Sequence, residues 1–226
     1  MGADEPTSLL ASRVVYQNSD VSSATYDISV PLNVALEVAC TEAEGPGRRY
    51  ALWVQGCPLR CPGCCNPEFL AFTPRSQRRI EDVVAAIDAA RGRGIEGISL
   101  LGGEPTRQAA GLALVAEATR AMGLSVMVYS GFTLTQLRAE HDHDIDRLLA
   151  ATDLLVDGPY LEARRTTERR FIGSTNQVLH ALSDRYRVDD PVFTADNTVE
   201  LRLVKAADGT SQLIVNGWPT LGARTR

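Results

Sequence analysis

Three cysteines in one short loop are the strongest chemical signal in the sequence. Cys57, Cys61 and Cys64 have C-x3-C-x2-C spacing in a stretch rich in proline and glycine, directly after the apolar run 50–54. The apolar run predicts a buried strand, and the stretch after it predicts irregular backbone that can fold around a small inorganic group. Three thiolates on a cubane cluster leave one iron without a protein ligand. That vacancy suits a reactive cluster better than an electron-transfer cluster.

A structural zinc site with Cys65 as the fourth ligand is the main alternative, because zinc prefers four sulfur or nitrogen ligands in a closed tetrahedron. Adjacent Cys64 and Cys65 are expected to point their side chains apart, which makes joint binding of one ion awkward. A second CxxC or HxxxH motif would be expected downstream, and the sequence has none. The spacing therefore favours an iron-sulfur cluster over zinc.

The cysteine loop resembles that of the radical S-adenosylmethionine (SAM) enzymes. The longer run from 44–48 through Cys64 and Asn66 is similar to the activating protein of anaerobic ribonucleoside-triphosphate reductase and its close relatives, and the likeness extends over roughly residues 32–219. The resemblance implies that Cys57, Cys61 and Cys64 bind a 4Fe-4S cluster whose open iron is chelated by SAM. It also implies that one electron splits SAM into methionine and a 5'-deoxyadenosyl radical.

The same resemblance assigns SAM-binding roles to polar and glycine residues further along the chain. The Gly-Gly-Glu-Pro stretch 102–105 is similar to the family motif for the SAM amino group: paired glycines allow close backbone approach, and a carboxylate can accept hydrogen bonds from an ammonium. The cofactor-binding residues implied in this way are Gly63, Cys65, Gly102, Gly103, Glu104, Pro105, Ser130 and Asp157.

Several of these positions have a plainer interpretation. Ser130 precedes Thr133, which could simply cap a helix, and the stretch 157–160 could be a tight turn.

Two residues depart from the pattern of the reductase activators. Cys65 stands where those proteins usually carry an aromatic residue. Ile172 stands where their Arg-Gly-Ser-x-Asn-Gln element has its arginine, with Arg170 two residues earlier.

The elements that must position these residues alternate between strand and helix. Apolar spacing predicts an edge strand over 32–39, helices over 80–90 and 108–122, and one or two short helices within 133–151. Strands are expected at 98–101, 125–129 and 154–156, each ending in a polar motif. The pattern predicts an α/β fold of parallel βαβ units, an open partial (β/α) TIM-like barrel with its site at the strand ends.

The C-terminal part has a different pattern, and the chain is expected to divide into three regions. Residues 198–204 and 212–215 alternate around Asp208-Gly209, which predicts a hairpin. The expected regions are a loose N-terminal leader over 1–31, the radical SAM partial barrel over 32–197, and a hairpin and tail of the same domain over 198–226.

Composition excludes several other classes of protein. The 226 residues carry a formal charge of −5, with a pI near 5.3, which argues against binding of nucleic acid. No segment is long and apolar enough for a membrane helix, and no signal peptide is visible, so a cytoplasmic location is expected. The His and Asp residues of 141–144 are expected to form a solvated connector, since neighbours two apart do not share a helix face.

Three functions remain open from the sequence. The first is an activase that installs a glycyl radical on a partner such as anaerobic ribonucleotide reductase, with an electron donor such as flavodoxin or ferredoxin. The second is a stand-alone radical SAM enzyme that modifies a small molecule or a peptide, which the departures at Cys65 and Ile172 would suit. The third is a non-catalytic iron-sulfur protein.

Overall fold

A seven-stranded mixed sheet forms the centre of the protein, as a computed structural model describes it for residues 31–205 and 209–217. The strand order is β3-β1-β2-β4-β5-β6-β7. The strands are β1 Leu32–Thr41, β2 Arg49–Val54, β3 Ser76–Arg78, β4 Gly97–Gly102, β5 Ser125–Tyr129, β6 Leu154–Asp157 and β7 Val178–Ala181, with β8 Glu200–Lys205 and β9 Ser211–Asn216 in a separate hairpin. The α-helices are α1 Ile80–Arg91, α2 Ala109–Ala121, α3 Leu134–Ala139 and α4 His143–Ala150; short 3-10 turns are η1 Pro67–Phe69, η2 Pro105–Gln108, η3 Glu162–Arg164 and η4 Pro191–Phe193.

Strand direction divides the sheet into a parallel centre and antiparallel edges. Strands β2, β4, β5 and β6 run parallel to one another, whereas β1 is antiparallel to both β2 and β3, and β7 is antiparallel to β6. The α/β class and the mostly parallel centre are confirmed, but the predicted open partial TIM-like barrel is not. The first strand was wrongly expected at an edge: β3, too short and polar to show an apolar pattern, pairs with its outer side.

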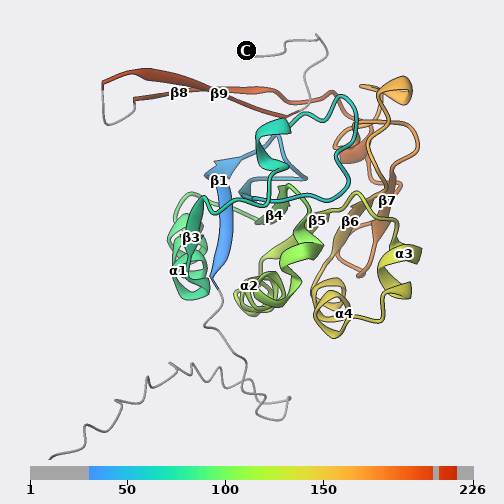
Figure 1. The fold of residues 1–226 in the computed structure, drawn as a ribbon, viewed down its shortest axis with the longest axis horizontal. Helices are drawn as coiled ribbons and strands as arrows, with labels where there is room; N and C mark the ends of the chain where they lie inside the picture. Colours follow the sequence, from blue (N-terminus) through green and yellow to red (C-terminus); the bar gives the residue numbers. More distant parts are fainter. Residues whose placement is uncertain (1–30, 206–208, 218–226) are drawn as a thin grey trace, which may run out of the picture.

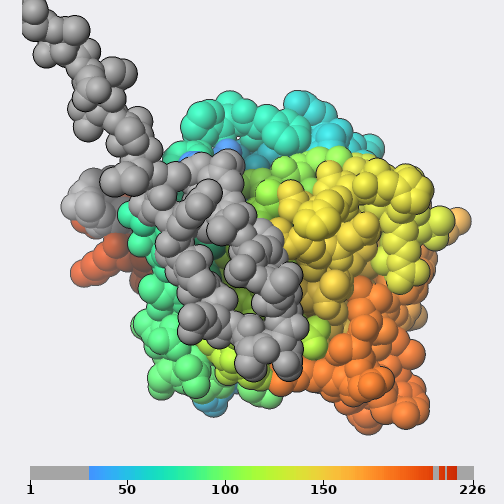
Figure 2. All heavy atoms as spheres, turned by 90° about the horizontal axis from the view of Figure 1, so that it is seen from below, coloured from blue at the N-terminus to red at the C-terminus, as the bar shows by residue number. Residues whose placement is uncertain are grey.

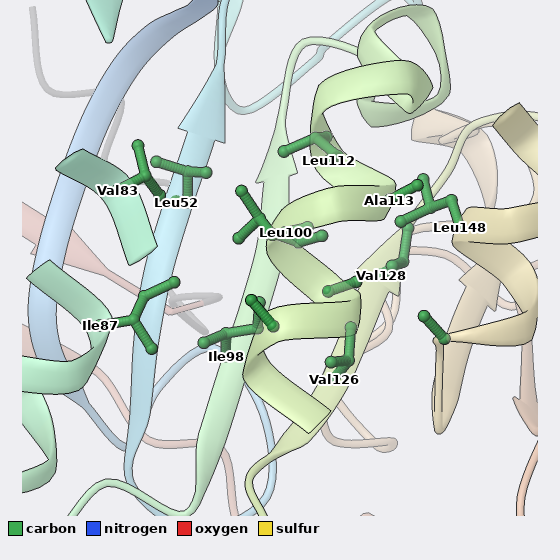
Figure 3. Close-up of a cluster of buried hydrophobic side chains, with 14 of the residues drawn as sticks. Leu52, Val83, Ile87, Ile98, Leu100, Leu112, Ala113, Val126, Val128 and Leu148 are labelled. Carbon is green, nitrogen blue, oxygen red and sulfur yellow. The ribbon is translucent and has the colours of Figure 1, made fainter. Parts of the chain in front are cut away.

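The largest core lies between the sheet and the helices. Figure 3 shows Leu52, Leu100 and Val128 of three adjacent parallel strands pointing towards the helices, where they meet Leu112 of α2. These three side chains lie in register across the strands, and Ile98 and Val126, two residues earlier in β4 and β5, belong to the same core, as the two-residue period of a strand requires. Figure 1 shows α1, α2 and α4 as a layer on one side of the sheet. Figure 2, seen from below, shows the yellow surface of α3 and α4 beside the orange surface of the chain that follows β6. We call this side the helix face.

The opposite side of the sheet carries the loop that contains the cysteines, and we call it the loop face. Trp53 of β2 and Leu101 of β4 point to this side and pack with Phe69 of η1. Figure 1 shows the teal loop after β2 lying across the loop face, away from α1, α2 and α4. The apolar contacts of Phe69 therefore hold the far end of the cysteine loop against the sheet.

The C-terminal hairpin is confirmed, and it projects from the loop face past the β1 side of the sheet (Figure 1). Its base is tied to the turn after β1, because Glu42 N donates to Glu200 Oε1 (2.7 Å) and Gly217 N donates to Glu44 Oε1 (2.8 Å). Further out, Leu201 and Leu203 are 68% and 73% exposed. Asp208, half of the expected turn, lies outside the described residues.

No helix within residues 31–205 and 209–217 is both long enough and apolar enough to cross a bilayer.

Candidate active site at the cysteine loop

The cysteine loop is closed at its base by backbone hydrogen bonds. Gly56 N donates to Phe69 O (2.8 Å) and Cys57 N donates to Leu70 O (3.0 Å), so the two ends of the loop lie side by side. The side chain of Gln55, the residue after β2, donates to Ala71 O (2.7 Å), which fixes the same junction. These bonds satisfy backbone groups that irregular structure would otherwise leave unpaired. The loop is therefore a closed unit attached to the end of β2.

The three predicted ligands lie at different depths but influence one another. Cys57 is buried, whereas Cys61 and Cys64 are half-buried. Burial raises the pKa of the Cys57 and Cys61 thiols, although backbone groups of Leu59 and Arg60 hydrogen-bond to Cys57 and oppose the shift. The nearby charges of Cys64 and Glu104 also raise the pKa of Cys61, so these groups lie close enough to interact electrostatically.

Cys64 and Cys65 do not point apart, contrary to the expectation from their adjacency. Their side chains hydrogen-bond to each other, and the Cys65 thiol lowers the pKa of Cys64 to about 6, while the pKa of Cys65 rises well above its usual value. Cys64 N also donates to Cys61 O (3.1 Å), which closes a backbone turn between these two predicted ligands. The adjacency of Cys64 and Cys65 is therefore no argument against a zinc site. The choice between zinc and an iron-sulfur cluster rests on the full set of donor side chains.

The donor set fits an iron-sulfur cluster better than a single metal ion. Within residues 31–205 and 209–217, no three His, Cys, Asp or Glu side chains converge closely enough to hold one ion. A cubane cluster does not need such convergence, because each cysteine binds a different iron. The stretch 141–144 is a connector only in part: of its four residues, His141 and Asp142 lie between α3 and α4, whereas His143 and Asp144 begin α4. Asp142 caps this helix by accepting from Asp144 N (2.9 Å) and Ile145 N (3.0 Å).

Glu104 is a buried carboxylate that joins the ends of two neighbouring strands. Its Oε1 accepts from Thr106 N (3.1 Å), Thr106 Oγ1 (2.8 Å) and Ser130 Oγ (3.0 Å), and its Oε2 accepts from Gly131 N (2.8 Å). Burial raises its pKa, and these four donors oppose the shift. The carboxylate therefore orients the loops after β4 and β5 towards each other, and a contact with SAM stays a prediction.

The glycines of this region allow backbone segments to approach one another. A Cβ on Gly103 would lie 2.2 Å from Gly56 O, and one on Gly102, at φ +111°, would lie 2.4 Å from Val54 N. A Cβ on Gly131 would lie 2.2 Å from Cδ1 of Leu59 in the cysteine loop. At Gly102 and Gly103 the near atoms belong to the backbone, so a side chain is excluded unless the backbone moves, whereas at Gly131 the Leu59 side chain would have to shift. The loops after β2, β4 and β5 thus form one close-packed rim.

Ser130 and Asp157 also bond to the chain itself. Ser130 Oγ accepts from Phe132 N (3.1 Å) as well as donating to Glu104, and Thr133 caps α3 in a capping box with Gln136, so the plainer interpretation of Thr133 is confirmed. Asp157 is buried; its Oδ2 accepts from Leu134 N (2.5 Å) and lies 3.0 Å from His180 Nε2. The roles predicted for Gly63, Cys65, Pro105, Ser130 and Asp157 in cofactor binding remain predictions.

A contact that the sequence did not suggest reaches the cysteine loop from the segment after β6. The Cys61 sulfur accepts a hydrogen bond from the Tyr160 backbone. A Cβ on Gly63 would lie 2.8 Å from Cδ of Glu162, so this segment packs directly on the cysteine loop. Backbone groups carry no residue signature, which is why sequence reasoning missed the contact.

Comparisons with known proteins agree with this site. Residues 43–180 match the family described as a 4Fe-4S single cluster domain. The chain is 33% identical over 143 residues to the anaerobic ribonucleoside-triphosphate reductase-activating protein of Vibrio cholerae, a match that covers 60% of this chain and 89% of the relative. The protein of the same name from Escherichia coli K12 is 29% identical over 61% of this chain and 91% of its own length. The pyruvate formate-lyase-activating enzyme of Listeria monocytogenes is 32% identical over 50% of this chain and 47% of its own length.

The fold and the cysteine loop define an iron-sulfur protein whose family match spans more than half of the chain. This chain belongs to the 4Fe-4S single cluster domain family and, within the radical SAM superfamily, to the activating enzymes. It is an enzyme of the radical SAM type, with a 4Fe-4S cluster and SAM as its cofactors.

Proposed function

We propose that this enzyme cleaves SAM reductively and uses the product to install a glycyl radical on a partner protein, an anaerobic ribonucleotide reductase. One observation carries the proposal: three cysteines with C-x3-C-x2-C spacing on the closed loop after β2, in the electrostatic range of the buried Glu104. The names of the relatives support the choice of partner, because the Vibrio cholerae and Escherichia coli proteins are activators of that reductase.

Residues of the rim have distinct tasks in this proposal. Cys57, Cys61 and Cys64 hold the cluster, and the Gly102–Pro105 stretch and Ser130 bind SAM. When bound, the cluster and SAM would supply one-electron cleavage of SAM to methionine and a 5'-deoxyadenosyl radical able to take hydrogen from glycine. Glu104 keeps the loops after β4 and β5 together, and its four internal donors hold it in place. An external donor such as flavodoxin or ferredoxin would supply the electron.

The test is made without oxygen on the full chain. Iron and sulfide are reconstituted, dithionite and SAM are added, and 5'-deoxyadenosine is quantified by mass spectrometry. We expect product in the wild type and none in Cys61→Ala, with Cys40→Ala as the matched control because Cys40 lies in β1, away from the loop. An intact cluster that neither binds SAM nor yields product would refute the proposal.

The partner is tested separately from the SAM chemistry. The anaerobic ribonucleotide reductase of the same organism is added to the reduced, SAM-loaded enzyme, and a glycyl radical signal is sought by electron paramagnetic resonance. Deoxyadenosine release without any glycyl radical would argue for another hydrogen donor.

A stand-alone enzyme that modifies a small molecule or a peptide is the second candidate. It is favoured by Ile172, which stands where the related activators carry arginine and is 1% exposed within an apolar cluster with Phe171 and Phe193. Arg170 does not replace that arginine freely, since its guanidinium donates to Glu42 O (3.2 Å) and Thr198 Oγ1 (2.6 Å). A SAM-cleaving enzyme that transfers hydrogen from a small substrate, and not from the reductase, would favour this candidate.

A further inference from the structure

Three side chains of the loop 173–177 hydrogen-bond to successive backbone groups of the segment after β6. Gln177 Nε2 donates to Gly158 O (3.1 Å), Asn176 Nδ2 donates to Pro159 O (2.7 Å), and Ser174 Oγ accepts from Leu161 N (3.2 Å). Each bond anchors a different peptide group. Three successive peptide groups, from Gly158 to Leu161, are therefore fixed by one loop.

The middle peptide group is the one that reaches the cysteine loop. Its carbonyl belongs to Pro159 and accepts from Asn176, and its N–H belongs to Tyr160 and donates to the Cys61 sulfur. A peptide group is planar, so the carbonyl and the N–H point in opposite directions from one rigid unit. When Asn176 fixes the oxygen of this unit, it also fixes the direction of the N–H at Cys61.

The loop that supplies these side chains is itself braced. Gln177 Oε1 accepts from Gly173 N (2.9 Å) and Ser174 N (3.1 Å), so the same glutamine closes its own loop and holds Gly158. Thr175 N donates to Arg164 O (2.9 Å), which ties the loop to η3 beyond Leu161. Ser174 is fully buried, and Asn176 is half-buried, with its Oδ1 shielded from solvent and without a hydrogen-bond partner among residues 31–205 and 209–217. Within this described part of the chain, the Asn176 side chain hydrogen-bonds through its amide nitrogen alone, to Pro159 O.

Hydrogen bonds to the sulfurs that bind an iron-sulfur cluster are among the features that set its reduction potential, because they stabilise the added negative charge of the reduced state. We propose that Asn176, assisted by Ser174 and Gln177, is a positioning residue that aims the Tyr160 N–H at Cys61 and thereby raises the reduction potential of the cluster. This inference rests on the proposed function only in taking Cys61 as a cluster ligand.

The test measures a potential rather than activity. The full chain is reconstituted with iron and sulfide, and the midpoint potential of the cluster is determined without SAM by a redox titration followed by electron paramagnetic resonance. We expect the potential of Asn176→Ala to move to more negative values and that of Ser174→Ala to move in the same direction. Thr175→Ala is the matched control, since Thr175 lies in the same loop with an exposed side chain outside this network. It should keep the wild-type potential.

Each outcome distinguishes the inference from the proposed function. An intact cluster with the wild-type potential in Asn176→Ala would overturn the inference and leave the ligand assignment standing. Loss of the cluster in Asn176→Ala would overturn it too if Ser174→Ala retained the wild-type potential. A Cys61→Ala chain that keeps the wild-type iron content and spectrum would overturn the ligand assignment, and the inference with it.

Discussion

Glu44 is a carboxyl group placed between the turn after β1 and the end of the hairpin. Its Oε1 accepts from Gly217 N (2.8 Å), and its side chain hydrogen-bonds to that of Asn216. Burial raises its pKa to about 7 against the opposing effect of these bonds, and the nearby charge of Glu200 raises it further. Cys65 and Tyr129 also lie within range of its charge. Glu44 therefore folds in its neutral form at mildly acidic pH.

This group should make the protein less stable as the pH rises from about 4.5 to about 7. In that window the folded chain holds a proton on Glu44 that the unfolded chain releases, so each pH unit costs up to about 1.4 kcal/mol. Urea unfolding of the cluster-free chain across this range should show a flatter profile for Glu44→Gln than for the wild type. Glu42→Gln, an exposed change in the same turn, should leave the slope as it is. Equal slopes for Glu44→Gln and the wild type would contradict the raised pKa of Glu44 in the folded protein.

Glu104 is expected to matter for folding as well as for SAM. Replacement by alanine leaves donors of Thr106, Ser130 and Gly131 without their acceptor, which should lower the free energy of unfolding on the order of 3 kcal/mol. Urea unfolding of the cluster-free chain measures this change. Glu140→Ala is the control, since Glu140 makes one half-exposed ion pair with Arg107. A loss within about 0.5 kcal/mol for Glu104→Ala would show that the four bonds contribute little.

At the scale of elements, the rim depends on how closely the loop after β4 approaches the cysteine loop. Gly103→Ala would place a Cβ 2.2 Å from Gly56 O, a backbone atom that cannot swing away. We expect the substitution to displace the start of the cysteine loop and to lower the iron bound per chain after reconstitution. Gly92→Ala at the end of α1 meets its nearest neighbour at 3.6 Å and should bind iron like the wild type. Full iron content in Gly103→Ala would mean that the loop tolerates this displacement.

Arg49 ties the starts of three parallel strands together on the loop face. Its fully buried guanidinium donates to Ser99 Oγ (3.1 Å), Ser125 Oγ (2.6 Å) and the Ile98 carbonyl, and burial lowers its pKa. Arg49→Ala should lower the free energy of unfolding on the order of 3 kcal/mol, as measured with urea, because these acceptors lose their donors. Arg48→Ala should stay within about 0.5 kcal/mol, since Arg48 forms an exposed ion pair with Glu42.

At the scale of the whole molecule, the hairpin lies outside the matched family region 43–180 and exposes an apolar surface. Leu201, Leu203 and Leu213 are 68%, 73% and 55% exposed, and Leu203 pairs with Leu213 across the ribbon. Replacing Leu201 and Leu203 by serine should leave the free energy of unfolding within about 0.5 kcal/mol, because little packing is lost. Light scattering should show less self-association at high concentration than for the wild type. Unchanged scattering would mean that the apolar ribbon does not drive association.

The sequence alone determined the chemistry and most of the elements. The cysteine spacing indicated the cluster, and strong apolar periodicity located α1, α2, β5 and the hairpin to within a few residues. These features are local: thiol spacing, helical stripes and strand alternation depend on residues close together in the chain. The short polar β3 and the four-residue β7 lack such a pattern and were not predicted.

Only the tertiary structure decided which groups of the rim bond to one another. It placed four donors on Glu104, brought Cys65 onto Cys64, buried Ile172 in an apolar cluster, and carried the Tyr160 amide to Cys61. Backbone groups look alike in every sequence, and a hydrogen bond between segments about a hundred residues apart depends on how the intervening strands pair. The sequence therefore identified the residues that can do chemistry, and the packing of the strand ends determined their hydrogen-bond partners.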